Sequence, residues 1–254
     1  MAASSTISLR QQAYDHLQRK LISGELRSGS VVSEQSLAEE IGVSRTPVRE
    51  AIRTLEMEGI LEQVPRFGTV VRKLDRRDLV ELYELREAIE PFSTARAARR
   101  ISASDLSNLE STIQAIEVLR DELGISGARQ LNENQMRRLL SADLTFHLTL
   151  LRASGNGRML KIVSDSRLLT GVFNSRRQPH TSAVVESTLD QHRAIVAAVQ
   201  ARNEGMAASA MLSHILHSKE QALEAFDFDM SSPSVPASTQ RIISELTRKP
   251  RSRK

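Results

Sequence analysis

Apolar residues recur about one helical turn apart through most of residues 9–228, and this pattern changes only once, after Gly59. Between residues 60 and 71, short β-prone runs flank a Pro-Arg-Phe-Gly sequence at positions 65–68. The combination predicts a mainly α-helical chain with one β-hairpin. The aromatic residues are only 6 Phe and 2 Tyr, so Leu, Ile, Val, Ala and Met have to fill the core, and these residues favour helices.

Composition excludes several classes of protein. The chain of 254 residues has no Cys, which excludes disulfide scaffolds, thiolate zinc sites, iron–sulfur clusters and cysteine nucleophiles, and fits a reducing compartment. No apolar run approaches the roughly 18 residues of a membrane span, and the polar start has no apolar signal-peptide core. We therefore expect a soluble, cytoplasmic protein without a membrane partner.

The amino-terminal pattern predicts three helices, near residues 9–24, 34–41 and 45–58. Ser33 and Ser44 are the expected caps of the second and third helices. The apolar residues of the third helix, expected to face inward, are Val48, Ile52, Leu55 and Met57. Three helices, the last two joined by a three-residue turn, followed by a hairpin predict a winged helix-turn-helix domain over residues 1–75.

The rest of the chain predicts a second, all-helical domain over residues 76–228. Helical stretches run near residues 76–101, 104–122, 131–154, 157–177, 183–202 and 205–226, with glycines and Pro179 between them. About six helices of this length predict a bundle. Residues 229–254 are expected to be a disordered basic tail with at most a short helix near 242–246.

The net charge of +4 arises in the tail. Residues 1–75 hold 10 basic and 10 acidic residues, residues 76–228 hold 19 of each, and residues 229–254 hold 6 against 2. Overall charge is therefore weak support for DNA binding, which has to be argued from the positions of individual arginines.

Those positions favour a DNA-reading helix. Arg45, Thr46 and Arg49 project together from the first turn of the third predicted helix, where they can reach base edges and phosphates. Arg66 and Gly68 at the hairpin tip suit a wing that follows the DNA backbone or minor groove. The alternative is a protein-contact module whose arginines lie on a solvated face.

Residues 33–71, SEQSLAEEIGVSRTPVREAIRTLEMEGILEQVPRFGTVV, closely resemble the winged helix of the GntR family of bacterial transcription regulators. The resemblance implies DNA contacts at Arg45, Thr46, Arg49, Arg66 and Gly68. Family members often have Arg where this chain has Gln35, which leaves a contact at that position in doubt.

Four residues of the second domain could bind a metal. Asp143 and His147 are spaced i, i+4 and share a helix face, and His192 and His214 lie in two other apolar-striped helices. Converging in a bundle core, they would suit a divalent ion such as zinc, nickel or manganese, with positions left for water or a ligand carboxylate. The alternative for each histidine is an ordinary, partly buried residue with hydrogen-bond partners.

The segments ADLTFHLTLLRASGN, ESTLDQHRAIVAAV and AASAMLSHIL look like successive helices of the FCD domain, the effector-binding module of the FadR branch of GntR regulators. This resemblance implies Asp143, His147, His192 and His214 as metal ligands. Gln191 replaces a Glu of many relatives, and His217 is expected to face another side. Similar proteins bind small organic acids, and Arg86 in LYELREAIEP matches a position that often faces the effector. The alternative for Arg86 is a surface ion pair with Glu87 or Glu90.

The expected function is that of a ligand-responsive transcription regulator, and of a repressor in particular. Its partners would be double-stranded DNA with a palindromic operator, a small carboxylate metabolite and a second copy of the chain, because two recognition helices read a palindrome as a dimer. Two alternatives are a metal-dependent hydrolase and a nonspecific architectural DNA-binding protein. The chain has no His-Asp dipeptide to support the first, and a neutral amino-terminal domain disfavours the second.

Overall fold

The computed structural model describes residues 8–22, 24–174 and 180–231. The tail beyond residue 231, with the helix expected near 242–246, and residues 175–177 of an expected helix lie outside the described residues. Within them the chain is mainly α-helical, with one two-stranded antiparallel sheet near the amino terminus. The predicted fold class, a winged helix-turn-helix followed by an all-helical bundle of six helices, is confirmed.

The amino-terminal domain consists of α1 (Leu9–Ile22), α2 (Glu34–Ile41), α3 (Arg45–Met57), β1 (Leu61–Val64) and β2 (Gly68–Val71). Its core is formed by one apolar face from each helix and by the start of the hairpin. The fully buried side chains of this core include Ala13, Leu17, Leu21, Val48, Ala51 and Leu55. The helical spacing read from the sequence accounts for these contacts.

Two details of the predicted helices differ in the structure. Met57 was expected to face inward but is 81% exposed. Since each residue turns a helix by about 100°, Met57 lies about 200° from the buried Leu55 and therefore points to solvent. Ser44 occupies the N-cap position of α3 without a capping hydrogen bond from its side chain, whereas the Ser33 hydroxyl accepts from the Ser36 amide at 3.2 Å as expected of a cap.

The hairpin is the predicted wing. β1 and β2 pair antiparallel, with Leu61 opposite Val71 and Val64 opposite Gly68. An additional edge, which was not predicted from the sequence, lies beside β2. Val31 forms a bridge with Val70, and the Val32 amide donates to the Thr69 carbonyl at 2.8 Å. This edge ties the segment before α2 to the wing.

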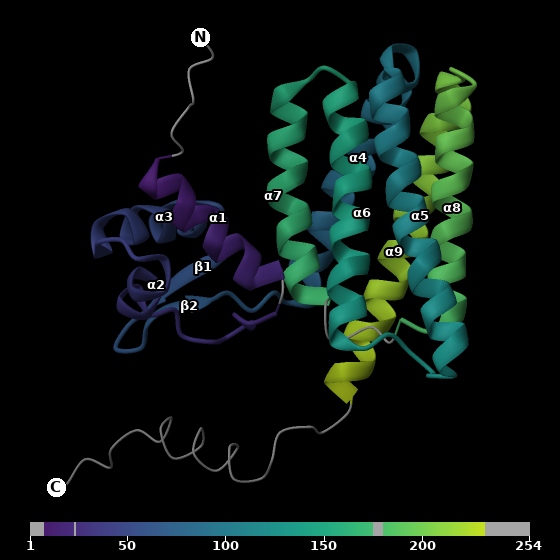
Figure 1. Cartoon of the computed structure of the whole chain (residues 1–254). Helices are drawn as coiled ribbons and strands as arrows, with labels where there is room; N and C mark the ends of the chain where they lie inside the picture. The colour runs from purple at the N-terminus through teal and green to yellow at the C-terminus, as the bar shows by residue number, and fades with distance from the viewer. Residues whose placement is uncertain (1–7, 23, 175–179, 232–254) are drawn as a thin grey trace, which may run out of the picture.

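Six long helices form the second domain. They are α4 (Arg76–Arg100), α5 (Ala103–Ser126), α6 (Glu133–Ala153), α7 (Gly157–Asn174), α8 (Ser182–Gln200) and α9 (Glu204–Ser231). Figure 1 shows α7, α6, α5 and α8 side by side in one layer, with α4 and α9 behind them. α5 runs four residues beyond its predicted end because Gly124 lies inside the helix, and the left-handed Gly127 (φ 61°) ends it instead.

The two domains contact each other through α1 and α7, which lie side by side in Figure 1. Leu169 on α7 packs against the apolar cores of both domains. Nearby, the Lys161 ammonium of α7 lies 3.6 Å from the carboxylate of Glu58 at the end of α3. One helix of the bundle is therefore attached directly to the winged helix.

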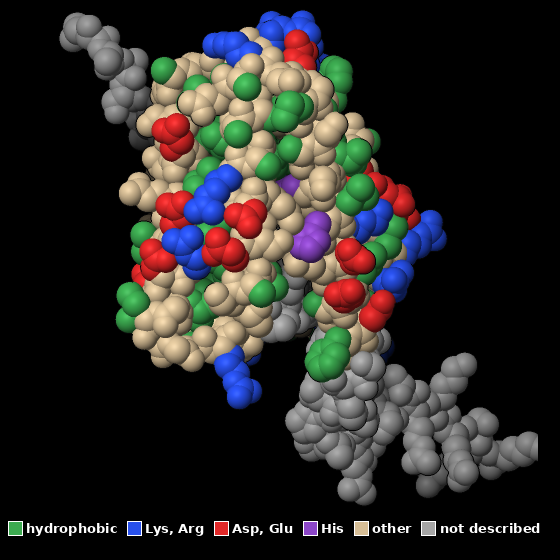
Figure 2. Space-filling model, turned by 90° about the vertical axis from the view of Figure 1, so that its right-hand side faces the viewer, with side chains coloured by type: hydrophobic (Ala, Val, Ile, Leu, Met, Phe, Trp, Pro, Cys, Tyr) green, Lys and Arg blue, Asp and Glu red, His purple; other side chains and the backbone are tan. Residues whose placement is uncertain are grey.

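Charges of both signs cover the face of the bundle that is turned away from the winged helix. In Figure 2 acidic and basic side chains are intermixed there. This agrees with the neutral charge of the region and gives the visible face no basic field that would attract DNA. Among the described residues, no helix combines the length and the apolar character that crossing a bilayer requires.

Candidate metal centre and nucleic-acid interface

The first turn of α3 presents polar side chains to solvent and apolar ones to the domain core. Arg45, Thr46 and Arg49 are exposed, whereas Val48 and Ile52 are buried. A helix that enters the major groove needs this division, because its outer side chains reach the bases while its inner ones hold it to the domain. The expected arrangement of side chains is present, and contact with DNA stays a prediction.

A carboxylate from α2 holds two of these arginines together. Glu34 accepts a hydrogen bond from Nη2 of Arg45 at 3.0 Å, and two from Nε and Nη2 of Arg49 at 3.0 and 2.9 Å. The hydrogen bonds from Arg49 lower the pKa of Glu34, although partial burial opposes them, so the side chain is a carboxylate at neutral pH. Sequence reasoning missed Glu34. Which side chain of α2 faces these arginines depends on the angle between α2 and α3, and the sequence of the short turn does not reveal that angle.

The other predicted DNA contacts lie apart from α3, at the tip of the wing. Arg66 and Gly68 are exposed in the hairpin turn and both have positive φ, 72° and 85°. Glycine adopts this conformation at little cost, whereas Arg66 is strained by it. The turn presents the Arg66 side chain to solvent at the end of the sheet, as a backbone-following wing would require.

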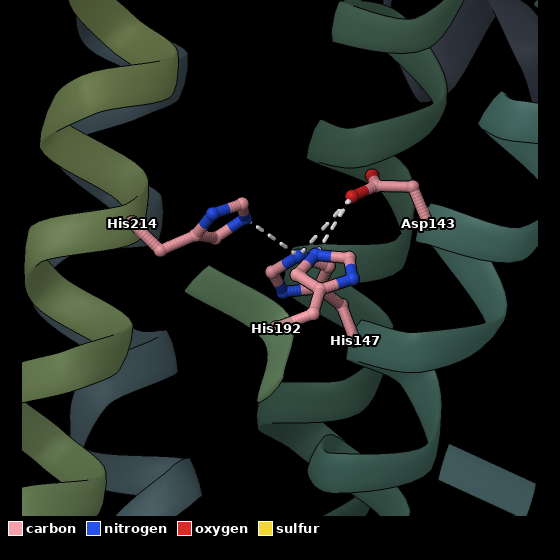
Figure 3. A group of neighbouring side chains, drawn as sticks. All are labelled: Asp143, His147, His192 and His214. Carbon is pink, nitrogen blue, oxygen red and sulfur yellow. Dashed lines mark hydrogen bonds and ion pairs between the residues drawn. The ribbon is translucent and has the colours of Figure 1, made fainter. Parts of the chain in front are cut away.

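The four predicted metal ligands meet in the core of the bundle. Asp143 and His147 come from α6, His192 from α8 and His214 from α9, and one ligand atom from each lies within 4.8 Å of the others (Figure 3). The three histidines are 0–3% exposed, and the Asp143 side chain is 28% exposed. The structure thus brings together four residues separated by up to 71 positions, the set that the resemblance to the FCD domain implied.

Partners outside the cluster orient two of the rings. Nδ1 of His147 lies 2.6 Å from a carboxylate oxygen of Glu90, and Nδ1 of His214 lies 2.7 Å from the side-chain oxygen of Gln191. Both oxygens accept, so both Nδ1 atoms are the donors, and the Nε2 atoms of the neutral rings carry lone pairs toward the centre. Gln191, the departure from the family pattern, therefore keeps an orienting contact with His214.

This orientation leaves nitrogen atoms in the centre without a suitable partner. Nε2 of His147 and Nε2 of His214 face each other at 3.2 Å, so two lone pairs meet in the neutral state. Neither ring nitrogen of His192 makes a hydrogen bond, and its Nε2 lies 3.4 Å from Asp143 Oδ1 without suitable geometry. Buried polar atoms of this kind are costly unless a cation satisfies them. The residues present fit a divalent metal, and His192 in particular lacks the protein partner that an ordinary buried histidine would have.

Burial and neighbouring charges shift the pKa values of Asp143, His192 and His214 in the direction that favours metal binding. Burial lowers the pKa of His192 and, with the other imidazoles, lowers that of His214 well below the usual range. Burial alone would raise the pKa of Asp143, but the Arg167 guanidinium and His147 hold it well below the usual range. Neutral imidazoles and an ionised carboxylate are the forms that bind a metal.

Two buried arginines surround the cluster. The Arg86 side chain is 5% exposed, and its Nε donates to Glu90 at 2.8 Å, so the expected alternative of a surface pair is wrong because this pair is buried. Arg167 donates to Glu90 from Nε at 3.1 Å and to Asp143 from Nη1 at 2.9 Å. Sequence reasoning missed Arg167, whose only signal was a basic residue between the buried positions Val163 and Thr170 of α7.

His217 lies outside the cluster, as the sequence suggested. Its Nε2 lies 3.3 Å from the Ser187 hydroxyl and 2.9 Å from the Gln221 amide nitrogen. Although it is only three residues from His214, it contacts a different part of α8 and makes a natural control in experiments on the metal ligands.

Comparison with protein families identifies both domains. Residues 9–71 match the model "Bacterial regulatory proteins, gntR family", and residues 81–217 match the FCD domain. The Nta operon transcriptional regulator of Aminobacter aminovorans is 32% identical over 80% of this chain and 89% of its own length. A probable D-xylose utilization operon repressor of Paenarthrobacter nicotinovorans is 28% identical (82% and 86%), and the gluconate operon repressor of Bacillus subtilis is 26% identical (76% of each).

Solved structures support the same fold. Escherichia coli McbR/YncC aligns with a TM-score of 0.75 at 19% identity, over 87% of this chain and 100% of its own. A putative GntR regulator from Rhodococcus sp. RHA1 aligns with a TM-score of 0.65 at 21% identity, over 85% and 98%. The relatives and the gntR family model describe regulators of transcription rather than enzymes, which removes the hydrolase alternative. The chain belongs to the GntR family of DNA-binding transcriptional regulators and carries an FCD domain.

Proposed function

We propose that the protein is a repressor whose affinity for a palindromic operator is controlled by a small carboxylate bound at a divalent metal in the FCD domain. The observation that carries this proposal is the meeting of Asp143 with three buried histidines, His147, His192 and His214, where neither ring nitrogen of His192 has a hydrogen-bond partner and the Nε2 atoms of the other two rings face only each other. Names of relatives, among them a gluconate operon repressor, support repression. We infer that it acts in the cytoplasm, where the operator is.

The DNA contacts are assigned to two exposed parts of the winged helix, the first turn of α3 and the tip of the hairpin. Arg45, Thr46 and Arg49 would read the major groove, and Arg66 with Gly68 would follow the backbone from the wing. Two copies of the chain would place two such domains on the half-sites of a palindrome. We place this DNA-binding unit in residues 1–75 and the effector unit in residues 76–228.

The metal would be held by the three Nε2 atoms and the Asp143 carboxylate. Zinc, nickel and manganese all accept this mixture of imidazole and carboxylate ligands. When bound, such an ion supplies a Lewis-acidic position for a ligand oxygen. Glu90 and Gln191 orient the rings, and Arg167 keeps Asp143 ionised.

Charge balance favours an anionic effector. Arg86 and Arg167 are paired with Glu90 and Asp143, so these four side chains are neutral together. A divalent ion would leave this buried region with two excess positive charges, which a carboxylate ligand would offset. Arg86 is the residue we assign to the effector, because a guanidinium binds a carboxylate through paired hydrogen bonds.

α7 offers a direct route between the two sites. Arg167 contacts the ligand Asp143, and Leu169 two residues later packs against the winged-helix core. A ligand that changes the partners of Arg167 would therefore bias the placement of α7 against α1. This supports control of the DNA-binding domain from the metal centre.

The proposal is tested by loading the purified full chain with Zn²⁺ and measuring metal content and DNA binding together. We expect one ion per chain in the wild type, loss of that ion in His192→Ala and its retention in His217→Ala. Binding of a selected palindromic duplex should respond to a panel of small carboxylates in the wild type. Absence of a stoichiometric ion, or equal DNA affinity with and without every carboxylate, would contradict the proposal.

A further inference from the structure

Glu34 lies at the first residue of α2, beside the two arginines assigned to base contacts, although a carboxylate near DNA is repelled by phosphates. Its side chain is 24% exposed, while those of Arg45 and Arg49 are 61% and 50% exposed. Three hydrogen bonds from the two guanidiniums converge on its two oxygens. An acidic group so placed needs an explanation beyond a surface ion pair, which is worth little.

The atoms used in these hydrogen bonds leave the outer edge of Arg49 available. Nε and Nη2 of Arg49 face Glu34, so one edge of the planar guanidinium is occupied by the carboxylate. The end formed by Nη1 and the second hydrogen of Nη2 is the edge that can donate to O6 and N7 of a guanine. Glu34 therefore fixes the plane of the Arg49 fork without using the donors that reading a base requires.

The carboxylate also keeps the two arginines together. Arg45 and Arg49 are spaced i, i+4 on α3, where like charges repel each other. A long arginine side chain loses rotamer freedom when it is fixed in one orientation, and a protein that has already fixed it loses less on binding. Hydrogen bonds from Arg49 hold the pKa of Glu34 below its ordinary value, so the negative charge persists throughout the neutral range.

We propose that Glu34 is a specificity-determining positioning residue, which orients Arg45 and Arg49 toward bases and disfavours their collapse onto phosphates. This inference rests on the proposed DNA contacts of the two arginines. Removal of the charge would free both side chains to bind any duplex through its backbone. Nonspecific binding would then tighten while discrimination between sequences falls.

The test compares Glu34→Gln with Glu39→Gln in the full chain. Glu39 lies on the same helix as Glu34, and the Glu39→Gln variant removes the same charge. The Glu39 carboxylate, however, accepts a hydrogen bond from Gln35 rather than from an arginine. Dissociation constants are measured over a range of salt concentrations for a duplex selected by the wild type and for a scrambled duplex of equal composition. Thermal unfolding of each variant reports whether its fold is intact.

For Glu34→Gln we expect the ratio of the two dissociation constants to fall about tenfold, with tighter binding of the scrambled duplex and a steeper salt dependence there. Glu39→Gln should keep the wild-type ratio. Equal ratios in the two variants, or parallel weakening on both duplexes together with a lower melting temperature, would overturn the inference. If the wild type itself does not distinguish the duplexes, the proposed DNA contacts fail instead.

Discussion

The protein contains two groups of charged and polar side chains that differ chiefly in their access to water. In the winged helix, Glu34 pairs with two arginines that are at least half exposed. In the bundle, three almost fully buried histidines lie beside the partly buried Asp143. Exposed pairs contribute about 0–1 kcal/mol and exchange partners readily, whereas a buried group without a partner costs several kcal/mol. The first group therefore suits reversible contact with DNA, and the second suits the resident ion proposed above.

Metal removal should have the largest effect. Chelation of the Zn²⁺-loaded wild type should lower its free energy of unfolding by about 4 kcal/mol if the metal was present at a thousand times its dissociation constant. Denaturant unfolding with and without chelator measures the difference. His192→Ala should show no response to chelator, and His217→Ala should respond like the wild type. An unchanged wild type would mean that the buried group is stable without an ion.

Truncation of the recognition helix should have the next largest effect. Arg49→Ala should weaken binding of a selected duplex by about 1–3 kcal/mol, because a paired contact with a base is lost. Fluorescence anisotropy titration at fixed salt measures this change. Arg77→Ala removes an equally charged but 85% exposed side chain on α4, where it pairs with Glu81, and serves as the matched control. If the two variants lose the same DNA affinity, Arg49 contributes only nonspecific charge attraction.

The link between the two regions can be weakened at α7. Leu169→Ala should reduce the free energy of unfolding by about 1–2 kcal/mol because this partly buried side chain packs on both cores. Zn²⁺ loading should slow amide hydrogen exchange in α1 of the wild type, and Leu169→Ala should lose that protection. Ile162→Ala changes a 46% exposed side chain of the same helix and should retain it. If Zn²⁺ still slows amide hydrogen exchange of α1 in Leu169→Ala, the metal centre does not act on the winged helix through Leu169.

The smallest effect is expected at a surface carboxylate of the winged helix. Hydrogen bonds from Lys20 and then from His16 lower the pKa of Glu40 to about 2. A lowered pKa in the folded state means that the contribution is present above pH 4.5 and is lost as the pH falls toward 2. Because Glu40 is exposed, we expect less than about 1 kcal/mol. The difference in unfolding free energy between the wild type and Glu40→Gln, measured in urea, should become smaller from pH 6 to pH 3. A constant difference would mean that the effect does not come from the charge of Glu40.

Local patterns predicted the fold well because they depend on neighbours in the chain. Helical spacing located the buried faces of α1 and α3, and Ser33 marked the start of α2. Errors arose where a residue type did not behave as its local pattern indicates. Met57 is apolar but lies on the outer side of α3, and Gly124 lies inside α5 instead of ending it. The edge at Val31 depends on contact with β2, which no local pattern reveals.

The candidate sites were predictable to different degrees for a similar reason. Asp143 and His147 share one helix face, and His192 and His214 fall in their own apolar stripes, so the pattern allowed them to converge. The complete set was implied by the resemblance to the FCD domain, and the structure brings it together. Glu34 and Arg167 were missed because their partners lie on other helices and the sequence carries no signal of which side chains meet. Arg86 was singled out as an effector residue, a role that stays a prediction, and its burial with Glu90 became evident only from tertiary packing.

The central claim is that exposed arginines of the winged helix read a specific DNA sequence. Selection of bound duplexes from a random pool, carried out with the full-length wild type and the Arg45→Ala/Arg49→Ala double variant, tests it most directly. We predict that the wild type alone enriches a short palindrome, because two recognition helices read two half-sites. Enrichment of the same sequence by the double variant, or of none by the wild type with and without Zn²⁺ and carboxylates, would contradict the claim.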